Sequence, residues 1–156
     1  PITLTDPKMT RFFLTYDDVA SLVLRAMKHT EGGEVFVHKM DAIRIEDLAE
    51  AMIEVFGPIY GHDPTNIDIT VTGRRVGETF DEEILTEREV SRTIENESLY
   101  AITPEQSGEN GYLTHEGIDG FEPVEDVVRS SERAEKLSRK ETITLLRTEF
   151  EEELPQ

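Results

Sequence analysis

A helical stripe between residues 45 and 56 is the feature that most limits what this chain can fold into. Gly57 and Pro58 follow the stripe and are a typical helix stop. The β-branched run of residues 67–72 then predicts a strand. The apolar residues that recur at helical spacing in the stripe are Ile45, Leu48, Ala49, Met52, Ile53 and Phe56.

The same alternation of helix and strand is present upstream. Thr15 followed by Asp18 is close to a capping box, and an apolar face then predicts a helix from Tyr16 to near Lys28. Residues 34–38 alternate and are rich in β-formers, so a short strand follows. Helices that alternate with strands indicate an α/β layer structure.

The second half of the chain has a weaker pattern. Residues 81–90 predict a short helix, residues 92–102 an edge strand, and residues 103–120 a loop. Ser138 and Glu141 form a capping box that opens a terminal helix, which must dock on another element because it is short. We therefore expect an α/β portion over 1–103, a loop-rich tail over 104–137, and a terminal helix with an acidic end over 138–156.

The charge excludes several classes of partner. The chain has 156 residues, with 34 acidic and 16 basic side chains and a formal charge of −18. Such a surface repels nucleic acid and anionic membranes, because binding phosphate backbones requires the opposite sign. An acid-rich, lysine-poor surface suits high salt, where screening reduces self-repulsion, so the composition favours a halophilic source.

Other residue types exclude further sites. There is no cysteine, and the four histidines show no ligand spacing, so we expect neither a disulfide nor a metal site. No apolar run is long enough to cross a membrane and no signal peptide is present, which favours a cytoplasmic protein. The chain begins with Pro1 inside an apparent strand or loop, and this indicates a piece of a longer protein.

Two adjacent arginines follow the strand predicted over 67–72. They lie in the sequence Gly73-Arg74-Arg75-Val76-Gly77-Glu78, where the glycines let the backbone approach a ligand and a guanidinium offers planar donors to phosphate oxygens. Arg11, among apolar residues, is a second candidate. Two arginines converging on one diphosphate is the resulting hypothesis, and Glu78 would accept hydrogen bonds from sugar hydroxyls. The alternative is that these arginines form ordinary ion pairs, Arg11 with Asp17 or Asp18.

Five segments occur in the order and at about the spacing found in one protein family. They are residues 9–13, 17–20, 33–37, 45–49 and 73–78. In them the chain resembles the C-terminal half of CapD-like polysaccharide-biosynthesis proteins, which are extended short-chain dehydrogenases acting on UDP-sugars. The tail from about residue 92 to 150 looks like an extension found on one branch. The resemblance implies that Arg11 and Arg75 bind the UDP diphosphate and that Glu78 lies near the ribose. Val76 and Thr79 depart from the family's usual proline and lysine.

The chemistry of that family needs parts that this sequence does not show. A glycine-rich turn after a strand seats the dinucleotide, but Gly108-Glu109-Asn110-Gly111 has no strand before it. No tyrosine is followed four residues later by the lysine of the family's general base pair. The resemblance therefore implies that a NAD(P)-binding Rossmann half lies outside this chain. It also implies that this chain alone holds no catalytic residue and binds no cofactor.

The resemblance favours one function and leaves two others open. We expect the UDP-sugar-binding portion of an inverting UDP-N-acetylglucosamine 4,6-dehydratase in surface polysaccharide biosynthesis, because the extension is present. The alternatives are part of a UDP-glucose-type 4-epimerase and a stand-alone, non-catalytic binding module. The expected partners are a UDP-sugar, the Rossmann half, and further copies of the chain bound through the C-terminal extension.

Overall fold

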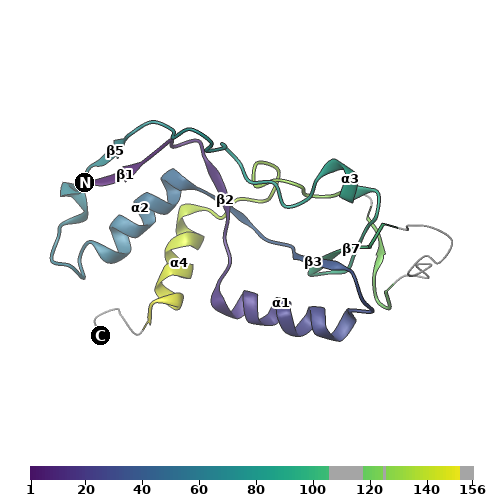
Figure 1. Ribbon diagram of the computed structural model, residues 1–156. Coiled ribbons are helices and arrows are strands. Elements are labelled where there is room, and N and C mark those ends of the chain that lie inside the picture. The colour runs from purple at the N-terminus through teal and green to yellow at the C-terminus, as the bar shows by residue number, and fades with distance from the viewer. Residues whose placement is uncertain (106–117, 125, 152–156) are drawn as a thin grey trace. The chain divides into compact units, whose positions relative to one another are not determined.

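The computed structural model describes residues 1–105, 118–124 and 126–151 of a mixed α/β chain (Figure 1). Contacts divide the chain into two compact units, each built from segments far apart in the sequence. The first unit comprises Pro1–Phe13, Asp41–Glu82 and the chain from Ser130 onward. The second unit comprises Leu14–Met40 and Glu83–Arg129. The predicted loop motif Gly108-Glu109-Asn110-Gly111 and the acidic end after residue 151 lie outside the described residues.

The first unit holds two small sheets and two α-helices (Figure 1). Strands β1 and β5 pair in parallel, and strands β2 and β4 pair antiparallel. The predicted strand at 67–72 is thus confirmed in a shorter form, and it is the strand that leads into the arginine pair. The elements are β1 (Ile2–Leu4), β2 (Thr10–Phe12), β4 (Ala42–Arg44), α2 (Ile45–Phe56), the 3-10 turn η1 (Pro64–Asn66), β5 (Ile69–Val71) and α4 (Arg139–Glu149).

Helix α2 is buried on two sides. The predicted stripe is present, with Ala49 and Ile53 buried, although Met52 is 41% exposed. Ala51 and Val55 lie roughly opposite on the helix and are buried as well, because Leu146 of α4 packs against them. The predicted docking of the terminal helix is therefore confirmed, and α4 contacts both Leu48 and Phe56 of the stripe and the small residues Ala51 and Val55 outside it.

The second unit contains a four-stranded antiparallel sheet in the order β3-β7-β6-β8. The prediction of one edge strand over 92–102 is wrong. The side-chain oxygen of Asn96 accepts hydrogen bonds from the N–H groups of Ser98 and Leu99, at 3.0 and 2.9 Å, and this turn folds the segment into a hairpin. Its second strand is central and fully buried. The elements are α1 (Tyr16–His29), β3 (Val35–His38), α3 (Glu87–Val90), β6 (Thr93–Glu95), β7 (Leu99–Ile102) and β8 (Glu122–Pro123).

Capping boxes begin helices α1 and α4 at the residues that the sequence predicts. At α1 the Thr15 hydroxyl accepts from the Asp18 N–H at 3.1 Å, and the Asp18 carboxylate accepts from the Thr15 N–H at 3.0 Å. The backbone N–H of Thr15 lowers the pKa of Asp18 below its ordinary value, since it stabilises the carboxylate. Ser138 and Glu141 repeat the arrangement at α4. Both predicted helix starts are therefore confirmed.

Candidate functional site

The loop after β5 is a closed turn that carries the two adjacent arginines. The Arg75 N–H donates to Oε2 of Glu78 at 2.8 Å, and the Glu78 N–H donates to the Arg75 carbonyl at 3.2 Å. Gly73 and Gly77 have φ of 82° and 90°, which only glycine adopts without strain. Each end of the turn thus depends on a glycine, and the turn holds its two arginines in a fixed local backbone.

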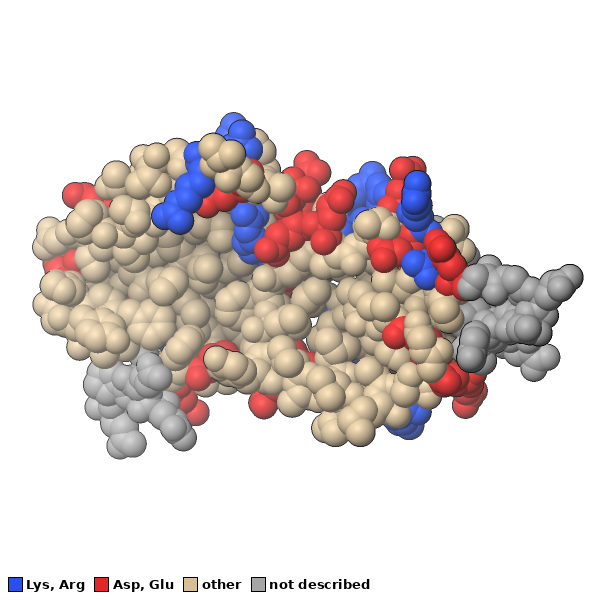
Figure 2. Space-filling model, viewed as in Figure 1, with Lys and Arg blue, Asp and Glu red and all other residues tan. Residues whose placement is uncertain are grey.

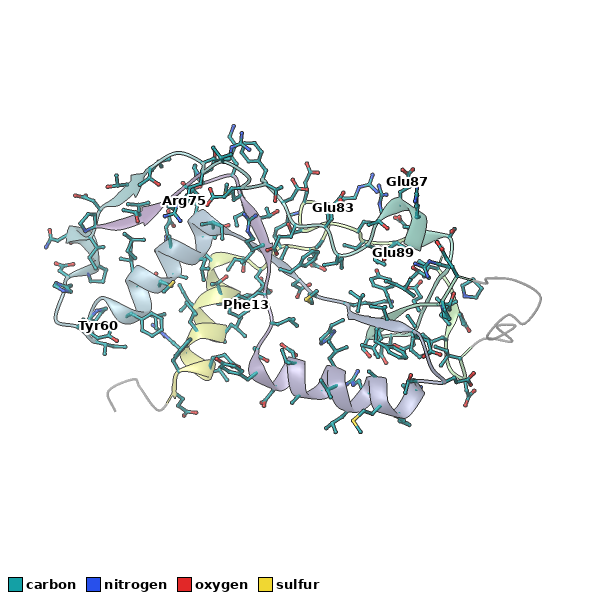
Figure 3. All side chains as sticks on the ribbon, viewed as in Figure 1. Phe13, Tyr60, Arg75, Glu83, Glu87 and Glu89 are labelled. Atoms are coloured by element: carbon teal, nitrogen blue, oxygen red, sulfur yellow. The ribbon has the colours of Figure 1, made fainter. Side chains whose placement is uncertain are left out.

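Arg75 presents its side chain to solvent (Figure 3). Within the described part of the chain, its guanidinium makes no hydrogen bond or ion pair that meets ordinary distance limits. Arg74 differs, because its guanidinium carbon lies 4.1 Å from the centre of the Phe80 ring and forms a cation–π contact. The space-filling view shows basic side chains gathered over this loop, with acidic side chains close by (Figure 2). Arg75 is therefore the donor that is ready to meet an anion.

Arg11 lies in β2 and has most of its donors in use. Its Nη1 donates to the carbonyls of Thr10 at 2.7 Å and Phe80 at 3.1 Å, and its Nη2 donates to the carbonyl of Thr79 at 3.0 Å. Its Nε lies 3.7 Å from Oε1 of Glu82, which is the ion-pair partner in place of the expected Asp17 or Asp18. Arg11 thus fastens the segment 79–82 to β2 with charge-assisted hydrogen bonds.

The three residues predicted for the site all belong to the first unit. Arg75 and Glu78 lie in one turn, and Arg11 binds the carbonyl of Thr79, the residue that follows Glu78. One carboxylate oxygen of Glu78 accepts the Arg75 N–H, which leaves the other oxygen for a hydroxyl donor. The structure therefore brings Arg11 next to the chain segment that continues from the arginine turn.

Sequence reasoning missed the residues that support Arg11 from the C-terminal tail. Ser131 is fully buried and its hydroxyl meets both Thr10 and Glu82. The only sequence signal was the pair Ser130-Ser131 in the segment that resembles the extension. Its partners are 49 and 121 positions away, so no local pattern predicts these hydrogen bonds.

The first unit also has an apolar pocket of about 730 Å³. In Figure 3, Phe13 and Tyr60 mark two of its walls, and the surface over α2 and α4 in Figure 2 is largely uncharged. Among the described residues that line it there is neither Lys nor Arg, so it offers a diphosphate no guanidinium or lysine ammonium. The lining residues from α2 and α4 are Leu48, Met52, Ile53, Phe56 and Leu146.

Other classes of site find no support in the described residues. They contain no group of three or more His, Cys, Asp or Glu arranged to hold a metal ion. Within the same residues, no helix has both the length and the apolar character needed to span a membrane. The arginine turn and Arg11 are thus the best candidate for ligand chemistry.

A comparison with known proteins gives the family. The family model described as "polysaccharide biosynthesis protein" matches residues 1–104 of the 156. The chain belongs to this family. The resemblance read from the five sequence segments is therefore confirmed, and the family match contains Arg11, Arg75 and Glu78.

Three curated relatives match nearly the same region. An uncharacterized membrane protein of Methanocaldococcus jannaschii is 41% identical over 104 residues, which are 67% of this chain and 31% of that protein. A UDP-glucose 4-epimerase of Rickettsia felis is 34% identical over 65% of this chain and 28% of its own length. An inverting UDP-N-acetylglucosamine 4,6-dehydratase of Campylobacter jejuni is 31% identical over 66% of this chain and 28% of its own length. The chain thus spans less than a third of the length of these relatives.

A solved structure extends the likeness into the tail. The X-ray structure of Pen from Bacillus thuringiensis matches with a TM-score of 0.76 and 30% identity. The match covers 99% of this chain and 42% of that chain. The described residues beyond 104, which the family model leaves out, therefore belong to the part of the chain that resembles this structure.

Proposed function

We propose that this chain is the UDP-sugar-binding portion of a NAD(P)-dependent nucleotide-sugar 4,6-dehydratase of the UDP-N-acetylglucosamine inverting type. The observation that carries the proposal is the solvent-facing guanidinium of Arg75 in a glycine-flanked turn, on a chain of the polysaccharide biosynthesis family. A guanidinium pairs with phosphate oxygens through two parallel hydrogen bonds. The expected ligand atoms at Arg75 are therefore those of the diphosphate.

Arg11 joins the site in a different way from Arg75. Its Nη1 and Nη2 already donate to three backbone carbonyls. The second N–H of Nη2 meets only the sulfur of Met9, at 3.7 Å, so a diphosphate that binds Arg11 directly would replace this weak acceptor or one of the carbonyls. A charged oxygen is a stronger acceptor than a carbonyl, so this exchange is favourable when the ligand is in place. Before binding, Arg11 fixes residues 79–82, the segment that follows the arginine turn.

A UDP-glucose-type 4-epimerase portion is the second candidate. The Rickettsia felis epimerase and the Campylobacter jejuni dehydratase match almost the same stretch, at 34% and 31% identity. Both proteins are named for reactions of a UDP-sugar, so the proposed role of Arg75 is the same in either case. The matched stretch is about equally similar to the dehydratase and to the epimerase.

The described residues do not fit a NAD(P) site. Such a site needs a strand of a parallel sheet, a glycine-rich turn and a helix whose N-terminus meets the pyrophosphate. In this chain β1 is followed by Thr5, Asp6 and Pro7, and the glycine-flanked turn after β5 leads into irregular chain rather than a helix. We therefore propose that NAD(P) is bound by a part of the protein beyond these residues.

A nucleotide titration tests the proposal. We expect the chain to bind UDP roughly ten- to a hundredfold more tightly than uridine, because hydrogen bonds to charged groups contribute about 1.5–3 kcal/mol. UMP should fall between the two. The measurement is the set of ¹H–¹⁵N shifts during titration with each nucleotide, which also detects millimolar binding. Equal affinities for UDP and uridine would contradict a diphosphate site.

A further inference from the structure

We propose that Ser131, in the C-terminal tail, is a positioning residue for Arg11 in the diphosphate site. This inference rests on the proposed function. It goes beyond that function because it assigns the tail, which lies outside the matched family region, a part in the site. Ser131 touches no proposed ligand atom and acts only through the backbone next to Arg11.

The hydroxyl of Ser131 has three partners and satisfies all of them. It donates its one proton to the Thr10 carbonyl at 3.1 Å. It accepts from the Glu82 N–H at 2.9 Å. Because its proton goes to the carbonyl, the Thr10 hydroxyl is the donor in the 2.8 Å contact between the two hydroxyls. A hydroxyl offers one donor and two acceptor positions, so its capacity is used completely. The side chain is fully buried, and a methyl or a bulkier group at this position could not replace these three hydrogen bonds.

The Thr10 carbonyl links Ser131 to Arg11. That oxygen accepts from the Ser131 hydroxyl and also from Nη1 of Arg11, at 2.7 Å. The same Nη1 donates to the Phe80 carbonyl, which in turn accepts the Thr10 N–H at 2.8 Å. Ser131 therefore fixes the carbonyl that orients the guanidinium.

Ser131 also fixes the segment that carries the other acceptors of Arg11. The Ser131 N–H donates to the Glu82 carbonyl at 2.9 Å, and the Glu82 N–H returns a bond to the Ser131 hydroxyl. The Glu82 carboxylate accepts a hydrogen bond from the Phe12 N–H at 3.1 Å and pairs with Nε of Arg11. Without the hydroxyl, the Glu82 N–H loses its acceptor and the segment 79–82 loosens.

The tail is held in register for this contact by further bonds of the same unit. Residues beyond Ser131 pair with β4, because the Ala42 N–H donates to Glu135 at 2.8 Å and the Leu137 N–H donates to Ala42 at 2.9 Å. Arg139, at the start of α4, then pairs with Glu50 and Glu54 of α2 at 2.7 and 3.0 Å. The docked helix thus keeps Ser131 in hydrogen-bond contact with Thr10 of β2.

The test compares Ser131→Ala and Ser131→Cys with Ser130→Ala in the full chain. Ser130 is a buried neighbour whose hydroxyl takes no part in the network, so it is the matched control. Loss of the hydroxyl should weaken UDP binding roughly three- to tenfold, as expected for one hydrogen bond acting through a neighbour. Ser131→Cys keeps the shape of the side chain but has a weaker donor, so it should give a similar loss of UDP affinity. It replaces the alanine variant in the test if that variant does not fold. Ser130→Ala should bind UDP like the wild type.

Two further readouts separate positioning from a general loss of stability. In a chain that carries Arg11→Ala, adding Ser131→Ala should give no further loss of UDP affinity, because the two residues act through one path. In the ligand-free chain, the Nε–Hε resonance of Arg11 should shift in the Ser131 variants and stay in place in Ser130→Ala. Additive losses, or an unmoved Arg11 resonance, would overturn the proposal. If the wild type binds no UDP, the proposed function fails, and the Arg11 resonance still decides whether Ser131 positions this side chain.

Discussion

Replacing Arg75 with alanine is expected to weaken UDP binding roughly ten- to a hundredfold, while the free energy of unfolding changes by less than about 0.5 kcal/mol. The side chain is exposed and has no hydrogen bond within the described residues, so its removal leaves the fold intact. Arg75→Lys should recover only part of the affinity, because lysine keeps the charge and loses the two-pronged geometry. The measurement is UDP titration by calorimetry, or by NMR if binding is weak.

Arg74→Ala is the matched control for this prediction. Arg74 has the same side chain one position earlier, but its guanidinium stacks on Phe80. Its loss should change UDP affinity little and reduce stability by about 0.5–1 kcal/mol. If Arg75→Ala binds UDP like the wild type, or if both variants lose affinity equally, Arg75 is not a specific diphosphate ligand.

Replacing Leu146 with alanine is expected to cost about 2–5 kcal/mol of unfolding free energy. Leu146 is 4% exposed and packs against Ala51 and Val55, so truncation leaves a cavity between α4 and α2. Ala51 and Val55 have small side chains that cannot extend to fill the cavity. Urea unfolding, followed by circular dichroism, measures the change.

Leu145→Ala is the control for Leu146, since it removes the same atoms at the next position of α4. Leu145 is partly exposed and is outside the buried cluster, so its replacement should cost clearly less. A loss below about 0.5 kcal/mol for Leu146→Ala, or equal losses for the two variants, would show that α4 does not dock through this face.

The sequence predicts those parts of the fold whose signals are local. Helices α1, α2 and α4 lie where stripes and caps place them, because Thr15 with Asp18 and Ser138 with Glu141 act across three residues. The hairpin of β6 and β7 was missed because its turn depends on the side chain of Asn96, which carries no periodic signal. The second buried face of α2 was missed because the small residue Ala51 does not extend the stripe of large apolar residues.

The candidate site stays a prediction, and the sequence indicates its residues better than their geometry. The glycine-flanked arginines and the acidic residue after them are contiguous, so the sequence alone singles out this turn. The partners of Arg11 lie about 70 positions away, at Thr79, Phe80 and Glu82, and tertiary contacts alone decide them. The role of the C-terminal extension in binding further copies of the chain stays a prediction.

The most direct test of the account is a UDP titration of the chain observed through its arginine Nε–Hε resonances. We expect the resonances of Arg75 and Arg11 to shift together and to saturate at one UDP concentration, while that of Arg147, an exposed arginine of α4, stays in place. Uridine at the same concentrations should leave all three unchanged, because it has no phosphate to accept the hydrogen bonds. Saturable UDP binding without a shift at Arg75 would contradict the central claim that the turn after β5 holds the diphosphate.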